Sequence, residues 1–179
     1  MSLRRPHRLW SSCGSNPFEV HKASIQAAML TGRYPTEKLQ RHWTENKSGL
    51  CSLPGCSGTD VGSLEHILLA CKALKAEREH AMKLCYETSL ENIPLFEIIN
   101  SYLSPDAPEH LSMQFLLDSC SLPEVRLLIQ AKDFLSLDKL LYVTRTWCYL
   151  IHRRRMTLLG YFKFRWHIFF SFVSFCDCG

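Results

Sequence analysis

Three cysteines and one histidine lie within one short stretch of this sequence, at Cys51, Cys56, His66 and Cys71. Thiolate sulfur and imidazole nitrogen are ligands that Zn²⁺ prefers, and three cysteines with one histidine form a recognised tetrahedral set. Pro54 and Gly55, between the first two cysteines, allow the chain to reverse so that both sulfurs can point at one centre. Because four protein ligands leave no open position for water, the pattern predicts a structural zinc site.

The alternative is that these are ordinary buried cysteines and that His66 caps a helix or packs in a core. The chain contains nine cysteines, several of them outside the cluster. The turn residues, and a gap between His66 and Cys71 of the length found between the later ligands of zinc fingers, favour zinc. The odd cysteine count and an N-terminus without an apolar core of signal-peptide length predict reduced thiols in an intracellular compartment, nucleus or cytoplasm.

The elements that position these ligands are expected to be helices. Five residues along an ideal helix rotate the side chain by about 140°, so a helix that begins near Ser63 must end or unwind at Cys71. Before the cluster we expect a helix over 17–31, and Thr36 opens a short second helix. After the cluster, the run of good helix formers in KALKAEREHAMKLCY predicts a helix that continues from the metal site.

Residues 104–108 (SPDAP) break the helical pattern and are predicted to form a linker. Beyond them we expect one helix around Phe115, another from Pro123 to about Phe134, and a long helix capped by Ser136. The long helix carries an apolar stripe before Gly160, formed by Leu137, Leu140, Leu141, Thr144, Trp147, Cys148 and Ile151. The predicted fold is mostly α, with short helices around a Cys3His zinc-stapled loop followed by a helical C-terminal segment.

The predicted organisation has a flexible basic segment at 1–15, a helical zinc-knuckle-like module at 16–103, a helical segment at 109–160 and an apolar aromatic tail at 161–179. The apolar run at 168–176 is shorter than the roughly 20 residues that a membrane span needs, so no span is expected. The tail is an interfacial anchor, a buried strand or a non-native extension.

The charge of the chain is unevenly distributed. Residues 1–50 carry eight Lys/Arg against three Asp/Glu, residues 51–110 carry four against nine, and residues 111–179 carry nine against five. Nucleic acid should therefore bind outside the acidic middle. Cations and planar rings gather just before the cluster, at Arg33, Tyr34, Lys38, Arg41, His42, Trp43 and Lys47. Such a set contacts phosphates and stacks on unpaired bases of RNA or single-stranded DNA. The alternative is that the rings are core and the cations form a solvated face.

The stretch MLTGRYPTEKLQRHW, followed by the Cys-Cys-His-Cys cluster that ends in EHILLAC, resembles a segment of a known family. It is similar to the zinc-binding region after the polymerase core of non-LTR, LINE-like retrotransposon reverse transcriptases. The resemblance covers roughly residues 17–85 and implies nucleic-acid binding around the metal ligands. The chain lacks the adjacent aspartate pair with which a polymerase palm holds its metals. The resemblance therefore implies a detached C-terminal fragment or domesticated remnant without the polymerase core.

Two functions follow from these patterns. The first is a non-catalytic module that binds zinc and nucleic acid, and the second is a zinc-stapled scaffold that binds a protein through the helix at 136–159. We expect no enzyme, since the sequence has no G-x-S-x-G, P-loop or HExxH motif. The basic run at 152–155 is either a nuclear signal or phosphate contact, or a set of cations favoured by the dipole at a helix C-terminus.

Overall fold

The computed structural model describes residues 8–44 and 48–161. Within them the chain forms helices and no β-strand, with one isolated β-bridge between Leu50 and Val61. In chain order the elements are α1 (Arg8–Ser11), α2 (Pro17–Leu30), α3 (Glu37–Arg41), η1 (His66–Ala70), η2 (Lys72–Leu74), α4 (Lys75–Ser89), α5 (Ile93–Leu103), α6 (Glu109–Asp118), η3 (Ser119–Ser121), α7 (Pro123–Gln130) and α8 (Phe134–Leu158). The predicted mostly α fold with a Cys3His loop is confirmed.

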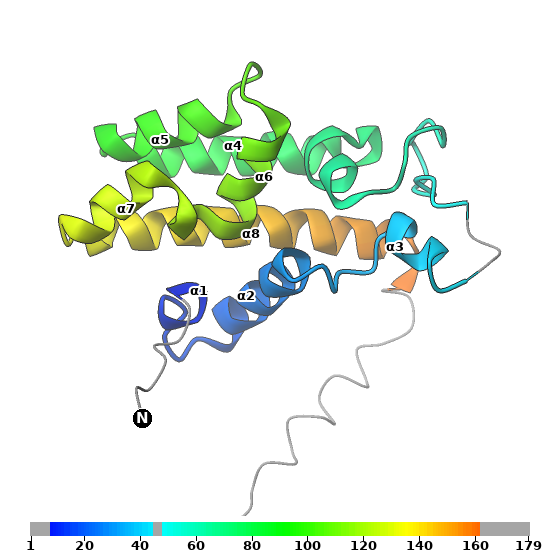
Figure 1. Ribbon diagram of the computed structural model, residues 1–179, viewed down its shortest axis with the longest axis horizontal. Helices are drawn as coiled ribbons and strands as arrows, with labels where there is room; N and C mark the ends of the chain where they lie inside the picture. The colour runs from blue at the N-terminus through cyan, green and yellow to red at the C-terminus, as the bar shows by residue number, and fades with distance from the viewer. Residues whose placement is uncertain (1–7, 45–47, 162–179) are drawn as a thin grey trace, which may run out of the picture.

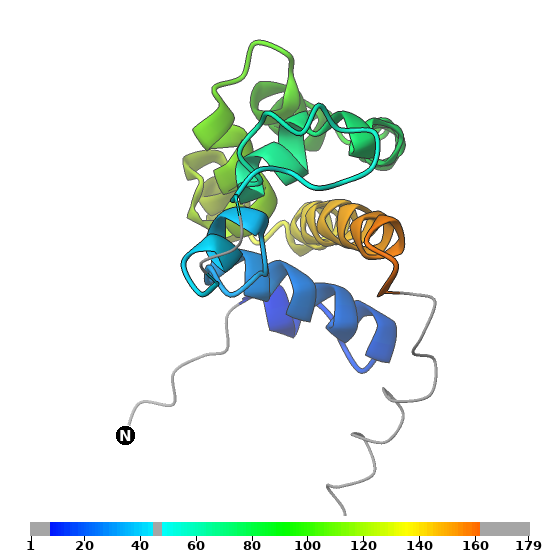
Figure 2. The same ribbon diagram turned by 90° about the vertical axis from the view of Figure 1, so that its right-hand side faces the viewer.

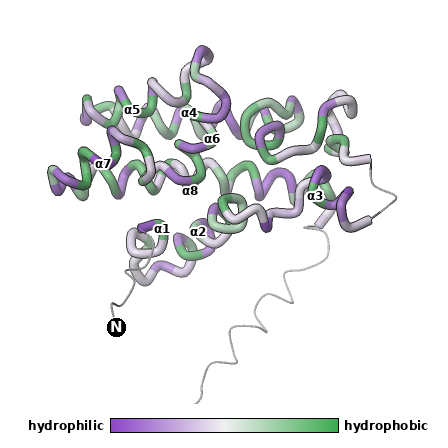
Figure 3. Tube along the Cα trace, viewed as in Figure 1, coloured by the Kyte–Doolittle hydropathy of each residue, from purple (hydrophilic) through white to green (hydrophobic). Residues whose placement is uncertain are grey.

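The longest helix, α8, lies at the centre of the molecule. α4 packs on one side of it and α2 on the opposite side, while α6 and α7 also contact it (Figures 1 and 2). Every residue of the predicted apolar stripe is buried, and polar residues off the stripe, such as Arg145 and Thr146, are buried as well. Figure 3 shows polar positions recurring between apolar ones along this helix. α8 is therefore enclosed on more faces than its apolar stripe predicts.

α2 and α3, the helices that precede the candidate ligands in the sequence, each begin at a side-chain cap. At the start of α2 the Asn16 side chain accepts a hydrogen bond from the Phe18 N–H at 2.9 Å, and after its end Gly32 adopts a φ of +69°. At the start of α3 the Thr36 hydroxyl accepts from the Leu39 N–H at 3.1 Å. Both predicted helices are confirmed, and their caps explain why they begin where they do.

The predicted cap of α8 is wrong. The helix begins at Phe134 because the Asp133 carboxylate accepts a hydrogen bond from the Ser136 N–H at 3.1 Å, which makes Asp133 the cap. Ser136 instead lies buried in the first turn, where its hydroxyl accepts from the Asn92 side-chain amide at 2.6 Å. This contact joins the first turn of α8 to the corner between α4 and α5.

Two further helix boundaries differ from the sequence predictions. α7 ends at Gln130 rather than near Phe134, because Lys132 adopts a φ of +57° and turns the chain. α5 is absent from the predictions, although Asn92 caps it by accepting from the Leu95 N–H at 2.9 Å.

The predicted linker at 104–108 joins α5 to α6, and these two helices pack against each other. Buried side chains from Ile25 to Ile151 form one continuous core across it. The two segments that flank 104–108 therefore share one core, and the metal loop is attached to that core.

The ends of the chain are described in part. Flexibility was expected throughout 1–15, but Leu9 and Cys13 are buried and pack against Ala23 of α2. Residues 1–7 and the predicted tail after Tyr161 lie outside the described residues. Across the described ranges, no helix has both the length and the apolar character needed to cross a membrane.

Candidate metal centre

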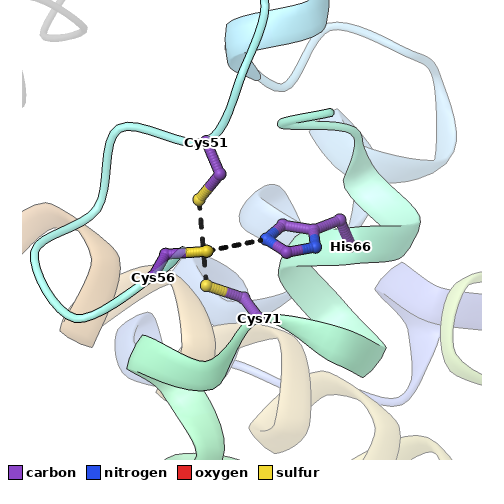
Figure 4. Close-up of side chains that lie close together, drawn as sticks. All are labelled: Cys51, Cys56, His66 and Cys71. Carbon is purple, nitrogen blue, oxygen red and sulfur yellow. Dashed lines mark hydrogen bonds between the residues drawn. The ribbon is translucent and has the colours of Figure 1, made fainter. Parts of the chain in front are cut away.

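The four predicted ligands converge on one point (Figure 4). The Sγ atoms of Cys51 and Cys71 are 3.8 Å apart, Cys56 Sγ lies 3.4 Å from His66 Nε2, and all four ligand atoms lie within 4.8 Å of one another. Bond lengths of about 2.3 Å to sulfur and 2.0–2.1 Å to nitrogen place adjacent ligand atoms of a tetrahedral zinc site roughly 3.5–3.8 Å apart. The cluster therefore has the donor chemistry and spacing to bind one metal ion.

Cys51 and Cys56 lie on the loop between α3 and η1. The Cys51 N–H donates to the Asp60 carbonyl at 2.8 Å, and the Cys56 N–H donates to the Leu53 carbonyl at 3.0 Å, which closes a tight turn between the two cysteines. Gly55 adopts a φ of +92° in this turn, a conformation that glycine reaches without strain. The turn predicted from Pro54 and Gly55 therefore points both sulfurs at the same centre.

His66 and Cys71 are positioned by a single π-helical turn. In η1 the Cys71 N–H donates to the His66 carbonyl at 2.6 Å, five residues back, and Cys71 then leaves helical geometry with φ −56° and ψ 120°. The wider turn and the break bring Cys71 round to His66, which a regular α-helix cannot do. The predicted unwinding at Cys71 is confirmed.

The electrostatics of the cluster favour a cation. Burial, reinforced by the other two thiols, raises the pKa of Cys51 to about 12, and burial raises that of Cys71. Burial also opposes ionisation of Cys56, but hydrogen bonds from the Gly58 backbone, the other thiols and His66 lower its pKa to about 6. Adjacent thiolates repel one another, whereas a divalent cation at their centre allows all three to ionise.

The ligand loop is fixed to the helices through Glu37, a residue that the sequence patterns did not indicate. Its Oε1 accepts from Arg155 Nη2 of α8 at 3.1 Å and from the Ser52 hydroxyl at 3.2 Å. Gly62 packs directly on this side chain, and a Cβ at Gly62 would lie only 2.7 Å from Glu37 Cβ. Glu37 therefore ties both sides of the loop to α3 and α8.

The residues predicted to contact nucleic acid do not all share one surface. Arg33, Lys38, Arg41 and Trp43 are exposed, Trp43 at 68%, as is the neighbouring His42. Within the described chain, none of Arg33, Lys38 and Arg41 makes an ion pair. Lys47 lies outside the described residues.

Tyr34 cannot offer the predicted stacking face. Its ring is only 4% exposed, its hydroxyl lies 3.1 Å from His152 Nδ1, and the Arg155 guanidinium lies 5.4 Å from the ring centroid. The prediction for Tyr34 is wrong because the C-terminal part of α8 covers the ring.

The basic run at the end of α8 does not form a continuous cationic surface. Arg155 is buried against Glu37, and Arg154 Nε lies 3.4 Å from Glu77 Oε1. Arg153 is exposed. Three of the four side chains in this run thus have partners within the fold, which weakens its interpretation as a phosphate contact.

His152 gives the fold a dependence on pH. Burial, with the positive charges of His21 and Arg155, lowers the pKa of His152 to about 4, against about 6.5 in an unfolded chain. Below about pH 6.5 the unfolded state binds more protons, so this contribution to stability is complete above that pH and is lost as the pH falls towards 4. We expect His152→Gln to remove about 1–3 kcal/mol of the difference in unfolding free energy between pH 7 and pH 4, allowing for partial solvent screening.

Urea unfolding of parent and variant at both pH values measures this difference. The matched control is His80→Gln, since His80 is exposed on α4. An equal loss of stability on acidification in the parent and in His152→Gln would contradict the prediction. Metal release in acid affects all three proteins, so only the differences between them are interpreted.

The apolar stripe of α8 is not available to a protein partner in this fold, because α2, α4, α6 and α7 pack around the helix. The predicted contact through 136–159 would therefore be confined to exposed positions such as Asp138 and Tyr142.

Comparison of the chain with protein-family models, with curated proteins and with solved structures found no match.

Proposed function

We propose that this chain is a non-catalytic zinc module that binds single-stranded RNA or DNA in an intracellular compartment. The observation that carries the proposal is a set of four exposed residues in and next to α3, namely Arg33, Lys38, Arg41 and Trp43, which we call the α3 surface. It combines exposed cations, which make no ion pair with another described residue, with an exposed indole. Cations of this kind bind phosphates, and an exposed indole can stack on an unpaired base.

Zinc is the metal that this site suits best. Three sulfurs and one imidazole nitrogen form a closed set of soft and borderline ligands, which favours Zn²⁺ over oxygen-preferring Mg²⁺ or Ca²⁺. Cys51 and Cys71 are buried, and His66 is nearly so. Such a centre stabilises the loop and leaves no coordination position for a substrate, which supports a structural role.

The metal loop also supports the α3 surface. A Cβ at Gly49, two residues before Cys51, would lie 3.0 Å from Arg41 Cδ, so the aliphatic stem of Arg41 lies against the loop backbone. Holding the stem in this way leaves the guanidinium near the surface and reduces the entropy lost on binding. The loop stapled by the metal therefore helps to position one of the proposed phosphate contacts.

The resemblance to the region after the polymerase core of retrotransposon reverse transcriptases supports the same proposal. The resemblance covers both the stretch from Met29 to Trp43 and the four candidate ligands that follow it in the sequence. We propose on this ground that the chain is a detached fragment or domesticated remnant of such an element.

The salt dependence of binding tests the proposal. Each phosphate neutralised on a single strand contributes about −0.7 to the slope of log affinity against log salt, so the parent should give roughly −2 to −3. We expect Arg41→Ala to reduce the magnitude of this slope by about 0.7. Trp43→Ala should weaken binding by ~1–3 kcal/mol with little change in slope, because stacking releases no counterions. Titrating zinc-loaded protein with single-stranded RNA at several salt concentrations measures both effects.

The matched control is Arg126→Ala, since Arg126 is exposed on α7, outside the α3 surface. It should leave the slope unchanged. Absence of binding at low salt, or a slope that neither Arg41→Ala nor Lys38→Ala alters, would count against nucleic-acid binding at this surface.

A second candidate function is a zinc-stapled scaffold that binds a protein. It is favoured by large apolar side chains exposed at the end of the molecule where α5 and α8 begin: Leu90 is 74%, Ile93 72% and Leu135 68% exposed. α5 and α8 begin at the same end of the molecule (Figure 1). A hydrogen bond between the Asn92 and Ser136 side chains joins the starts of these two helices. Binding of a protein with little dependence on salt would favour this candidate.

A further inference from the structure

An open groove with a volume of about 620 Å³ lies beside the α3 surface. It runs between the end of α2, α3, residues 63–65 and α6. Its lining includes Met29 and Met113, at 2% and 8% exposed, and the half-buried Leu39 and Leu64. Its volume is in the range of ligand-binding pockets, and its lining mixes apolar side chains with a similar number of polar ones.

We propose that this groove holds one unpaired base of a single-stranded nucleic acid, an inference that rests on the proposed function. A base is flat and neutral, with hydrogen-bonding groups along its edge. The half-buried side chains of Leu39 and Leu64 offer apolar surface for the ring. Gln114 Nε2 donates to the Ser121 hydroxyl at 2.7 Å, and that hydroxyl donates to the Asp118 carbonyl at 2.8 Å. The edge of a base would therefore meet the second N–H and the carbonyl oxygen of the Gln114 amide.

The charges around the groove favour a base inside and phosphates outside. Glu65 lines the groove and would repel a phosphate, but it does not repel a neutral base. Lys38 and His42 also line it, while Arg33 and Arg41 are exposed next to lining residues in the sequence. A strand whose phosphates contact these cations would bring its bases to the groove.

This arrangement predicts selectivity for single strands. In a duplex the bases are stacked and paired, and placing one in a pocket requires unstacking it. A single strand can turn out a base at low cost, as in the sites of many sequence-tolerant RNA- and DNA-binding proteins. Binding should therefore depend on bases as well as on backbone charge.

A strand without bases separates these two contributions. We would titrate the zinc-loaded full chain with an RNA oligonucleotide and with an abasic strand of the same length and charge. All of these proteins carry Trp43→Ala, so that stacking on Trp43 does not contribute; the protein with this change alone is called the background protein. Gln114→Leu removes the side-chain amide from the groove without adding an aromatic ring, and Gln130→Leu, at an exposed position of α7, is the matched control.

We expect the background protein to bind the RNA about tenfold or more tightly than the abasic strand, since a stacked base contributes on that order. Gln114→Leu should weaken this preference and leave the affinity for the abasic strand unchanged, and Gln130→Leu should leave both unchanged. A DNA strand of the same sequence, run in parallel, distinguishes RNA from DNA as the source of the base.

Photocrosslinking gives a second measurement that does not depend on how the groove variant folds. A thio-substituted base should crosslink to peptides that contain Met29 or Met113. Equal affinity of the background protein for the two strands, or crosslinks confined to other regions, would show that the groove does not hold a base. The proposed binding of phosphates by the α3 surface would not be affected by that result. If neither strand binds the parent, the proposed function itself fails and the groove inference fails with it.

Discussion

Cys56→Ser is expected to abolish tight zinc binding, from one ion per chain to none, and to unfold residues 48–75. Structural zinc contributes an apparent ~10–16 kcal/mol in finger peptides, as much as the whole stability of a typical domain. Apart from the cluster itself, the loop between α3 and η1 is attached in the described chain mainly by the Glu37 contacts, the buried Leu53 and an isolated bridge between Leu50 and Val61. Without the metal, this loop should become accessible to proteases.

The helices around the core should survive this change. α8 is covered by α2, α4, α6 and α7 independently of the ligand loop, so circular dichroism should retain most of the helical signal. Overall stability should still fall, because Leu53 and Ile67 contribute buried side chains to the same core. Metal content by mass spectrometry and limited proteolysis with mapping of the cleavage sites measure the two effects.

Cys120→Ser is the matched control for Cys56→Ser. Both cysteines are half-buried, so both substitutions place a hydroxyl in a similar environment, but Cys120 lies outside the cluster. The control should keep its zinc and its resistance to proteolysis. If Cys56→Ser kept both as well, the cluster would not be a structural metal site.

The convergence of the four candidate ligands could be predicted because their signals are local. The gap between His66 and Cys71, and the Pro54–Gly55 turn, restrict where four side chains can point without any knowledge of the rest of the fold. Helix α2 was predictable for the same reason, since Asn16 and Gly32 act on the backbone within a few residues of themselves. Asn92 followed by Pro94 is a comparable local signal, and it indicates the start of α5.

Long-range burial could not be predicted from the same patterns. A ring among cations gives the same local sequence whether it faces solvent, as Trp43 does, or lies beneath another helix, as Tyr34 does. The burial of Arg145 depends on Glu19, whose Oε2 lies 3.3 Å from Arg145 Nη2 across the contact between α2 and α8. Hydrophobic periodicity contains no information about such polar pairs.

The buried pair of Glu37 and Arg155 is the most consequential of these unpredicted contacts. Both side chains are almost fully buried, and Arg155 also packs over the Tyr34 ring. Glu37 Oε2 and Arg155 Nε find no hydrogen-bond partner among the described residues, so each charge depends strongly on the other. Removing one partner leaves an uncompensated buried charge, whereas replacing both need not.

Glu37→Gln is therefore expected to lower the free energy of unfolding by about 3–5 kcal/mol. The double variant Glu37→Gln/Arg155→Met should recover much of that loss, because it removes the isolated guanidinium. Glu77→Gln is the control, since its partner Arg154 is about half exposed and such pairs contribute about 0–1 kcal/mol. Urea unfolding of the zinc-loaded proteins measures all three. A loss for Glu37→Gln no larger than that for Glu77→Gln would show that the pair does not hold α3 and the ligand loop to α8.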